Sequence, residues 1–495
     1  DTWEGYRVEP SFIALTGTAS RNVLIDIMKE LGINDQEAVK EPKSFDRSNL
    51  MFEIHKISKK DRIDSLGKIV RSLITEFGWD SEKAISVPSG LVFTNFCNGN
   101  LGVQVLREKI IKELEELNLP NLSEQVRIYC GKSPKSFKDN STRIEVSKWN
   151  GVKSKVQRDF KDDKIPILIC THAFGMGIDK PNIRFTVHAM LPRSIEDFYQ
   201  QCGRAGRDGI ISMCVLCFSD DQEDLSTNIL DTEKTLFETI GEQINDGFGK
   251  YLSNQDDAIR NIYFLRSNFL GRDVEKDILK EVILTFIVPN IDKNEIIIPF
   301  NALNNKVKSG KEVHDEADNS IRVDKALDES KVNALEKTLY RLMIVGVIED
   351  YLKDYTRKEF SVIPGSIDPK RISAALREYL RKYILPSEMG KYLPNQNCTE
   401  NDLAGFVYGS ILIEFIYDKI EKRRRESMGQ ILKISRDGVR DGADSFREQI
   451  LAFLERSDFT ELVENLSDDS IGWFNVLDKV ENDDDVTKLL GACRR

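Results

Sequence analysis

Two arginines and three glycines in the short stretch QQCGRAGRDG are the first residues of this sequence that could carry out chemistry. Gln200, Arg204 and Arg207 are spaced i, i+4 and i+7, which would place their side chains on one helix face. Ser194 and Asp197 form a capping box, which predicts that this helix begins there. Two neighbouring guanidinium groups fit a polyphosphate, because each can donate two charge-assisted hydrogen bonds. A pair of surface arginines neutralised by carboxylates is the alternative.

The elements that must position these arginines alternate between strands and helices. Apolar runs predict strands at 11–17, 49–58, 90–95, 126–131, 166–172, 183–190 and 211–218, and stretches with helical periodicity separate most of them. Such alternation predicts an α/β fold with a mostly parallel sheet that helices cover on both faces. Ligands bind at the carboxyl ends of the strands in sheets of this kind. The polar stretch 133–155 is expected to be a loop.

Composition limits the class of protein. The chain has 495 residues, 40% of them hydrophobic, which is enough for several domains in a protein without membrane contact. Its formal net charge of −11 indicates that any contact with nucleic acid is local. Scattered cysteines favour a reducing, cytoplasmic or nucleoid-associated setting. Cys214 and Cys217 lie in an expected buried strand without a second CxxC, so no metal site is expected.

Four short segments resemble, in the family's order, motifs of RecQ-type superfamily-two DNA helicases. ALTGTAS (14–20) is similar to motif III and GLVFTN (90–95) to motif IV. AFGMGIDKP (173–181) resembles motif V and YQQCGRAGRDG (199–209) resembles motif VI. The resemblance implies two RecA-like domains with ATP and Mg²⁺ bound between them. It also implies single-stranded DNA as a partner, together with a junction or duplex.

The resemblance implies roles for matched residues only. Arg207 would be the arginine finger, Arg204 a second phosphate or interdomain contact, and Gln200 would orient the hydrolytic groups. Asp179 and Gly177 would contact the nucleotide. Along the DNA strand the matched residues would be Asn95, Thr171, Gly175 and Met176. Thr16 and Thr18 would couple ATP hydrolysis to closure of the two domains. His172 is expected to face DNA or to pack, and His188 to lie in the core or to contact a loop.

The phosphate cradle that the arginines would require is not found in the sequence. No GxxxxGK[ST] motif is present, and no DEAH or DEAD sequence precedes the motif III segment at 14–20, where the family carries its acidic box; the letters DEAD at 315–318 lie far outside that position. We therefore expect the chain to be a piece of a longer protein, inactive alone, with ATP and Mg²⁺ held mainly by residues outside it. Residues 219–300 contain no cysteine, so the zinc site of many relatives is not expected either.

The expected organisation has five parts. They are the end of a first RecA-like domain with a linker (1–85), a second RecA-like domain (86–220), a helical connector without zinc ligands (221–285), a winged-helix-like module (286–365) and an all-helical region (366–495). The resulting hypothesis is an ATP-dependent DNA helicase or translocase moving 3′ to 5′, with protein partners on the helical region. The alternative is a noncatalytic DNA-binding or scaffold subunit, and an RNA helicase is a third, weaker interpretation.

Overall fold

The computed structural model describes residues 46–77, 88–117, 125–134, 146–174, 179–233, 255–303, 321–384, 388–393 and 401–455. Before residue 46 it describes isolated positions, among them the paired strands β1 (Thr2–Trp3) and β2 (Tyr6–Arg7). The strand expected at 11–17 lies outside the described residues. The chain divides into two compact units, Asp1–Asp221 with Gln430–Arg495, and Gln222–Gly429, which are treated separately here.

A six-stranded sheet forms the centre of the first unit, and all of its strand pairs are parallel. Its order is β3-β8-β7-β4-β6-β5. The strands are β3 (Leu50–Lys56), β4 (Ser89–Phe93), β5 (Val126–Tyr129), β6 (Ile167–Cys170), β7 (Ile183–His188) and β8 (Ser212–Phe218). The central strands read as continuous apolar runs because both of their faces are buried. The expected parallel sheet is confirmed.

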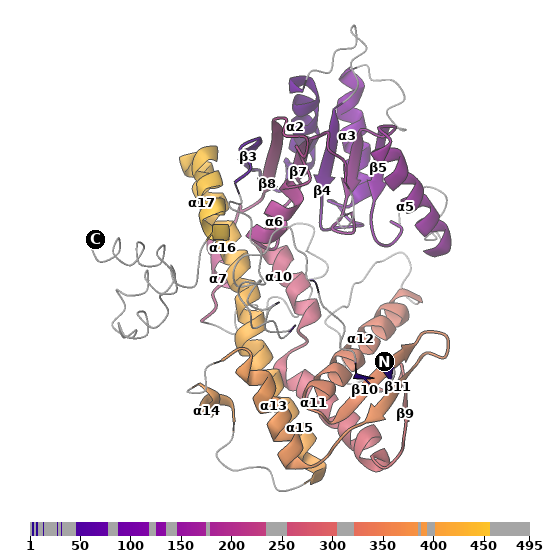
Figure 1. Ribbon diagram of the computed structural model, residues 1–495. Coiled ribbons are helices and arrows are strands. Elements are labelled where there is room, and N and C mark those ends of the chain that lie inside the picture. Colours follow the sequence, from indigo (N-terminus) through magenta and orange to yellow (C-terminus); the bar gives the residue numbers. More distant parts are fainter. Residues whose placement is uncertain are drawn as a thin grey trace, which may run out of the picture. The chain divides into compact units, whose positions relative to one another are not determined.

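Helices cover both faces of the sheet (Figure 1). Helices α2 (Arg62–Glu76) and α3 (Val103–Leu114) share one hydrophobic core with the strand residues Val92 and Val187. The short 3-10 turn η2 (Glu115–Leu117) continues α3. On the other face lie α6 (Ile195–Cys202) and α17 (Ala443–Glu455). Their aromatic side chains meet the sheet in a cluster whose ring centroids lie 5.6 to 6.2 Å apart, formed by Phe52, Phe198 and Phe446.

Helix α5 (Val146–Lys161) corrects the expectation of a loop over 133–155. Trp149 is only 2% exposed and donates its ring N–H to Cys130 O at 3.0 Å, and Phe160 is fully buried. Trp149, Val152, Val156 and Phe160 follow one another at three- and four-residue spacings, which is a helical period hidden among many lysines. Burial of this stripe stabilises the helix despite its polar composition.

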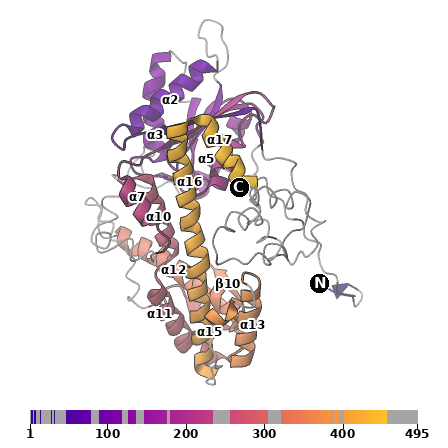
Figure 2. The ribbon, with the colours of Figure 1, turned by 90° about the vertical axis from the view of Figure 1, so that its left-hand side faces the viewer.

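Helix α17, the last helix that the structure describes, packs in the first unit, although residues 366–495 were expected to form one helical region. Gly442, with φ +100°, ends α16 (Lys422–Asp441) and allows the turn into α17 (Figure 2). Arg436 pairs with the fully buried Asp220 through two hydrogen bonds of 2.6 and 3.1 Å. Arg447 donates to Arg47 O at 3.1 Å and also pairs with Asp46. These contacts and the aromatic cluster explain why residues 430–455 belong with the sheet.

Where the structure describes the second unit, it is helical apart from one three-stranded antiparallel sheet of order β10-β11-β9. Its elements are α7 (Glu223–Ile229), α10 (Asp257–Asn268), α11 (Arg272–Val282), η4 (Ile283–Ile287), η5 (Val288–Asn290), β9 (Ile296–Pro299), α12 (Ile321–Ile344), β10 (Ile348–Asp354), β11 (Glu359–Pro364), α13 (Pro369–Arg381), α14 (Met389–Tyr392), α15 (Asn401–Ile416), η6 (Tyr417–Glu421) and the first part of α16. The helix followed by a hairpin after Gly346 agrees with the sequence expectation. The third strand, β9, was not expected.

None of the helices that the structure describes is both long and apolar enough to cross a membrane. Among the same residues, no three His, Cys, Asp or Glu side chains gather as a metal site would require.

Candidate functional site

The motif VI segment begins as a helix but does not continue as one through its arginines. Ser194 caps α6 by accepting a hydrogen bond from Asp197 N at 3.2 Å, so the predicted helix start is confirmed. The helix ends at Cys202, however, and a loop follows. The prediction that Gln200, Arg204 and Arg207 share one helix face is therefore wrong. Gly203 and Gly206 break the helical period, because glycine favours a turn where the chain must change direction.

Arg47, just before β3, holds this loop in place. Its guanidinium donates to three backbone carbonyls, those of Gly203 at 2.9 Å, Ala205 at 3.0 Å and Gly206 at 2.6 Å. Asn49 adds a bond from Nδ2 to Gly206 O at 2.8 Å. Hydrogen bonds from a charged donor are stronger than neutral ones, so the loop is fixed to the start of β3. Composition and periodicity gave no signal for Arg47.

Gly206 occupies a position that only glycine fits. Its φ is +57°, and a Cβ there would lie 2.4 Å from Asn49 Nδ2 and 2.9 Å from Ile210 O. Its own N–H donates to Ile183 O at 2.9 Å. The loop therefore passes close against β7 and the Asn49 side chain, which sets the direction of the residues on either side.

The two arginines of the loop lie in different environments. Arg207 is 36% exposed and donates from Nη1 to Asp179 Oδ1 at 2.9 Å. Arg204 is buried, at 8% exposure, and its Nε has no hydrogen-bond partner among the described residues. Desolvation lowers the pKa of Arg204, with an opposing contribution from Cys170 at the end of β6. Arg204 is thus a buried cation whose Nε–H remains available to an acceptor.

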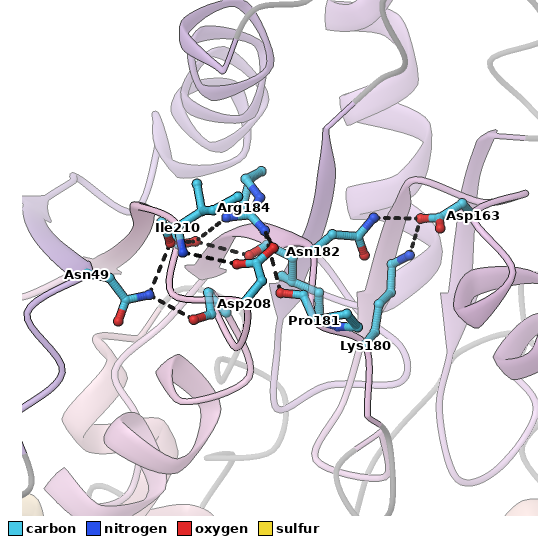
Figure 3. Close-up of polar contacts among 12 residues, drawn as sticks. Asn49, Asp163, Lys180, Pro181, Asn182, Arg184, Asp208 and Ile210 are labelled. Atoms are coloured by element: carbon cyan, nitrogen blue, oxygen red, sulfur yellow. Dashed lines mark hydrogen bonds and ion pairs between the residues drawn. The ribbon is translucent and has the colours of Figure 1, made fainter.

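Ion pairs fix the flanks of motifs V and VI (Figure 3). Arg184 of β7 pairs with Asp208, whose Oδ1 also accepts from Ile210 N at 3.1 Å. Lys180, 1% exposed, pairs with Asp163, which also accepts from Asn182 Nδ2 at 2.9 Å. Although desolvation alone would raise it, these donors lower the pKa of Asp163. Both ends of the 179–184 stretch are therefore anchored.

A second polar group lies where strands β4 and β6 end. His172 Nε2 lies 2.9 Å from Asn95 Oδ1, and Gln201 Nε2 lies 3.0 Å from His172 Nδ1. The two partners suit a neutral imidazole that donates from Nε2 and accepts at Nδ1. Desolvation lowers the pKa of His172, Asp197 opposes this, and Arg193 and Arg204 lower it further. The ring therefore links a motif IV residue to α6 without carrying charge.

His188 lies behind this group in the core, as expected. Its ring stacks on Phe93 with centroids 5.4 Å apart, and its Nδ1 lies 3.3 Å from Val215 O. Desolvation lowers the pKa of His188 to about 3. Together with His172 and Gln201 it borders a cavity of about 10 Å³, which is about the space of one water molecule.

The predicted site residues fall into three groups. Asn95 and Thr171 lie at the carboxyl ends of β4 and β6, and Asp179 and Arg207 meet directly. Gln200 is exposed on α6, and its neighbour Gln201 makes the contact to His172 instead. Five further predicted residues lie outside the described ones: Thr16, Thr18, Gly175, Met176 and Gly177.

Residues 89–209 match the model of the helicase conserved C-terminal domain. This span contains β4 to β7, α6 and the motif VI loop. The chain is 33% identical over 211 residues to the ATP-dependent DNA helicase RecQ of Bacillus subtilis, a match that covers 43% of this chain and 28% of that protein. This region is a helicase C-terminal domain of the RecQ type. The name RecQ-type domain is used for it below.

The RecQ-type domain is also similar to a yeast protein. ATP-dependent helicase SGS1 of Saccharomyces cerevisiae is 30% identical over 220 residues, covering 42% of this chain and 12% of that protein. The chain thus spans less than a third of the length of these two curated relatives. In the RecQ-type domain, Asn95 and His172 follow strands β4 and β6 and meet Gln201 of α6. Arg204 and Arg207 lie on the loop between α6 and β8, which contacts the starts of β3 and β7.

Proposed function

We propose that this chain supplies the second motor domain and the C-terminal modules of an ATP-dependent DNA helicase or translocase that moves 3′ to 5′. The observation that carries the proposal is the motif VI loop, held by Arg47 so that Arg207 stays exposed while Arg204 is buried, with no acceptor for its Nε–H among the residues that the structure describes. A loop that is fixed before its ligand arrives stabilises developing charge without reorganising.

The arginines fit the phosphates of a nucleotide. Exposed ion pairs contribute about 0 to 1 kcal/mol, so Arg207 can leave Asp179 for a phosphate at little cost. In this account Arg207 is the arginine finger, Arg204 a second phosphate or interdomain contact, and Gln200 orients the hydrolytic groups. Asp179 and Gly177 contact the nucleotide. ATP with Mg²⁺, held mainly by residues beyond this chain, supplies the phosphoryl group whose transfer drives the cycle.

The DNA strand in this proposal passes over the carboxyl ends of β4 and β6. Asn95 and Thr171 lie there, and Gly175 and Met176 follow in sequence. Contacts to phosphates predict binding that weakens as salt concentration rises. Thr16 and Thr18 would couple hydrolysis to closure. The net charge of −11 agrees with a grip confined to such loops.

The three-stranded sheet and α12 of the second unit are proposed to form a winged-helix module that meets duplex or junction DNA. The hairpin β10–β11 carries two well-exposed apolar side chains, Leu352 at 69% and Tyr355 at 75% exposure. Lys353 lies 5.1 Å from the ring centroid of Tyr355 and pairs with Glu336. An exposed aromatic beside a cation can stack on an opened base pair. The helical region after 366 is proposed to bind protein partners, in a cytoplasmic or nucleoid-associated protein.

A noncatalytic DNA-binding or scaffold subunit is the second candidate. The observation that favours it is Arg207, which already has an acidic partner in Asp179. DNA-stimulated ATP hydrolysis by the full-length protein separates the two. The motor proposal expects that single-stranded DNA raises the hydrolysis rate at least tenfold, and that the stimulation falls as salt rises. DNA binding without any stimulation of hydrolysis would favour the scaffold.

A further inference from the structure

Two cysteine thiols lie close together beyond the carboxyl ends of two strands of the parallel sheet. Cys97 follows β4, Cys130 directly follows β5, and their Sγ atoms are 3.4 Å apart. Both are in the thiol form. An S–S bond is about 2.0 Å long, so the two sulfurs would need to approach by roughly 1.4 Å to form one. Neither residue lies in a helix or strand, so side-chain rotation and a small shift of the loops can close that distance.

The surroundings of the two thiols hold them in place and give them different access to solvent. Lys132 O lies 3.2 Å from Cys97 Sγ and 3.0 Å from Cys130 Sγ, so both sulfurs face the same carbonyl. Trp149 donates its ring N–H to Cys130 O at 3.0 Å, which fixes the backbone of this cysteine. Cys97 is half-buried, whereas Cys130 is 0% exposed. An oxidant from solvent therefore reaches Cys97 first.

The charge states assign different parts to the two thiols. The hydrogen bond with Cys97 and burial raise the pKa of Cys130, and the positive charge of Lys153 opposes them. Lys153 Nζ donates to Gly131 O at 3.2 Å, next to the cysteine in the chain. Cys130 is therefore a thiol at neutral pH and the weaker nucleophile, because the thiolate is the reactive form. The reaction with an oxidant has to begin at Cys97.

We propose that Cys97 and Cys130 form a reversible disulfide when the protein meets a peroxide. The Cys97 thiolate attacks one peroxide oxygen, the O–O bond breaks, and Cys97 becomes a sulfenic acid as hydroxide leaves. The Cys130 sulfur then attacks Cys97 Sγ, its proton passes to the departing hydroxyl group, and water leaves as the S–S bond forms. Two electrons pass from the thiols to the peroxide, and a dithiol reductant restores both thiols by exchange. A transient bond of this kind suits the reducing setting expected from the sequence.

The disulfide would restrain the loop that follows β4. In the sheet, β6 lies between β4 and β5, so the bond would join the loops on either side of the β6 end. On one side Thr94 N donates to Cys170 O at 2.9 Å, and on the other Thr171 N donates to Tyr129 O at 3.1 Å. Amide hydrogen exchange at 94–102 should therefore slow in the oxidised protein. This inference does not depend on the proposed function, because it concerns a covalent bond and its local effect.

Peptide mapping of the full chain after treatment with hydrogen peroxide tests the proposal. The remaining thiols are alkylated and the chain is cut with trypsin without reductant, which places the two cysteines in separate peptides, 84–107 and 128–132. We expect these peptides to be linked, and dithiothreitol to release them. Cys202 and Cys214 are the internal control, because they are a second pair of neighbouring thiols but are both fully buried. They should stay unlinked.

Two variants separate the roles of the thiols. Cys130→Ser should stop the reaction at the Cys97 sulfenic acid, which dimedone labels. Cys97→Ser should form no link and leave Cys130 unlabelled. If Cys130→Ser fails to fold, brief peroxide treatment of the wild type with dimedone present should label Cys97 ahead of Cys130.

Hydrogen exchange then measures the restraint on the loop. In the linked wild type, amide exchange at 94–102 should slow by about fivefold or more, and in peroxide-treated Cys97→Ser it should not change. The proposal is overturned if the linked peptides are absent, or if Cys97 links to another cysteine in higher yield. Labelling of Cys130 ahead of Cys97 would also overturn it, and so would unchanged exchange at 94–102 in fully linked protein.

Discussion

Arg207 Nη1 lies 2.9 Å from Asp179 Oδ1, and this ion pair joins the motif VI loop to the last part of motif V. Both side chains are at least one-third exposed, so solvent screens the pair and the structure does not depend on it. In the motor proposal, this contact keeps Arg207 near the position from which it would reach a phosphate. The relationship makes the two roles of Asp179, as a partner of Arg207 and as a nucleotide contact, separable by experiment.

Asp179→Asn should leave stability almost unchanged and weaken the nucleotide complex. The loss of an exposed pair predicts a fall of less than about 1 kcal/mol in the free energy of unfolding. Because Asp179 is proposed to contact the nucleotide, KM for ATP should rise severalfold in the full-length enzyme. Urea denaturation and steady-state kinetics measure the two quantities. A loss of several kcal/mol would mean that the pair is structural.

Arg47→Ala should release the motif VI loop. The variant loses three hydrogen bonds from a charged donor, which predicts a destabilisation on the order of 2 to 4 kcal/mol. Amide hydrogen exchange at 203–209 should accelerate more than elsewhere in the sheet. ATP hydrolysis should fall although Arg47 is assigned no nucleotide contact. Arg158→Ala, at an exposed side chain on α5, is the control and should show none of these effects. Unchanged amide hydrogen exchange at 203–209 in the Arg47 variant would show that Arg47 does not position the loop.

Gly206→Ala and Gly209→Ala form a matched pair, because both glycines have positive φ. A Cβ at Gly206 would lie 2.4 Å from Asn49 Nδ2, whereas a Cβ at Gly209 meets nothing within 4 Å. Gly209→Ala should therefore cost about 1 kcal/mol of backbone strain, and Gly206→Ala at least about 1 kcal/mol more. Thermal and urea unfolding of both variants measure the difference. Equal losses in the free energy of unfolding of the two variants would show that Asn49 moves away from a Cβ at position 206 at no cost.

His188 predicts a loss of stability in mild acid. Its pKa of about 3 in the folded state lies below the ordinary value of 6.5, so the unfolded chain binds the proton more readily. Above about pH 6.5 His188 is neutral in both states and the free energy of unfolding is at its full value. As pH falls from 6.5 towards 3, the unfolded chain takes up the proton first and the free energy of unfolding decreases. Between pH 6.5 and about pH 5 the loss should be roughly 2 kcal/mol. In urea titrations, His188→Leu should reduce the dependence of the free energy of unfolding on pH. A smaller dependence should remain from His172, whose pKa is also lowered. An equally steep slope in the variant would contradict the assignment.

Much of the fold could be predicted because buried parallel strands are continuous apolar runs. GLVFTN, ILIC and SMCVLCF are too apolar for strands with one face in water, and the alternation of strands and helices predicts their order along the chain. Helix α5 was missed because lysines obscure the stripe from Trp149 to Phe160. Packing of α17 on the sheet could not be predicted, because Phe446 and Arg447 meet partners almost four hundred residues earlier.

The site was predicted in part. The resemblance to RecQ-type motifs IV to VI identified Asn95, Asp179 and Arg207. The shape of the motif VI loop depends on Arg47 and on positive φ at Gly206, neither of which a helical spacing rule contains. Spacing therefore assigned Gln200 to the arginine face, whereas the end of α6 turns Gln201 towards His172.

The most direct test of the motor account is ATP hydrolysis by full-length Arg207→Ala in saturating single-stranded DNA. An arginine finger contributes about 10³ to 10⁵ in rate, so kcat should fall by at least about a thousandfold. ATP affinity, measured by equilibrium binding, should change only a few-fold, and the control Arg158→Ala should behave like the wild type. Near-normal hydrolysis by the Arg207 variant would contradict the account, because the exposed guanidinium would then be no more than the surface partner of Asp179.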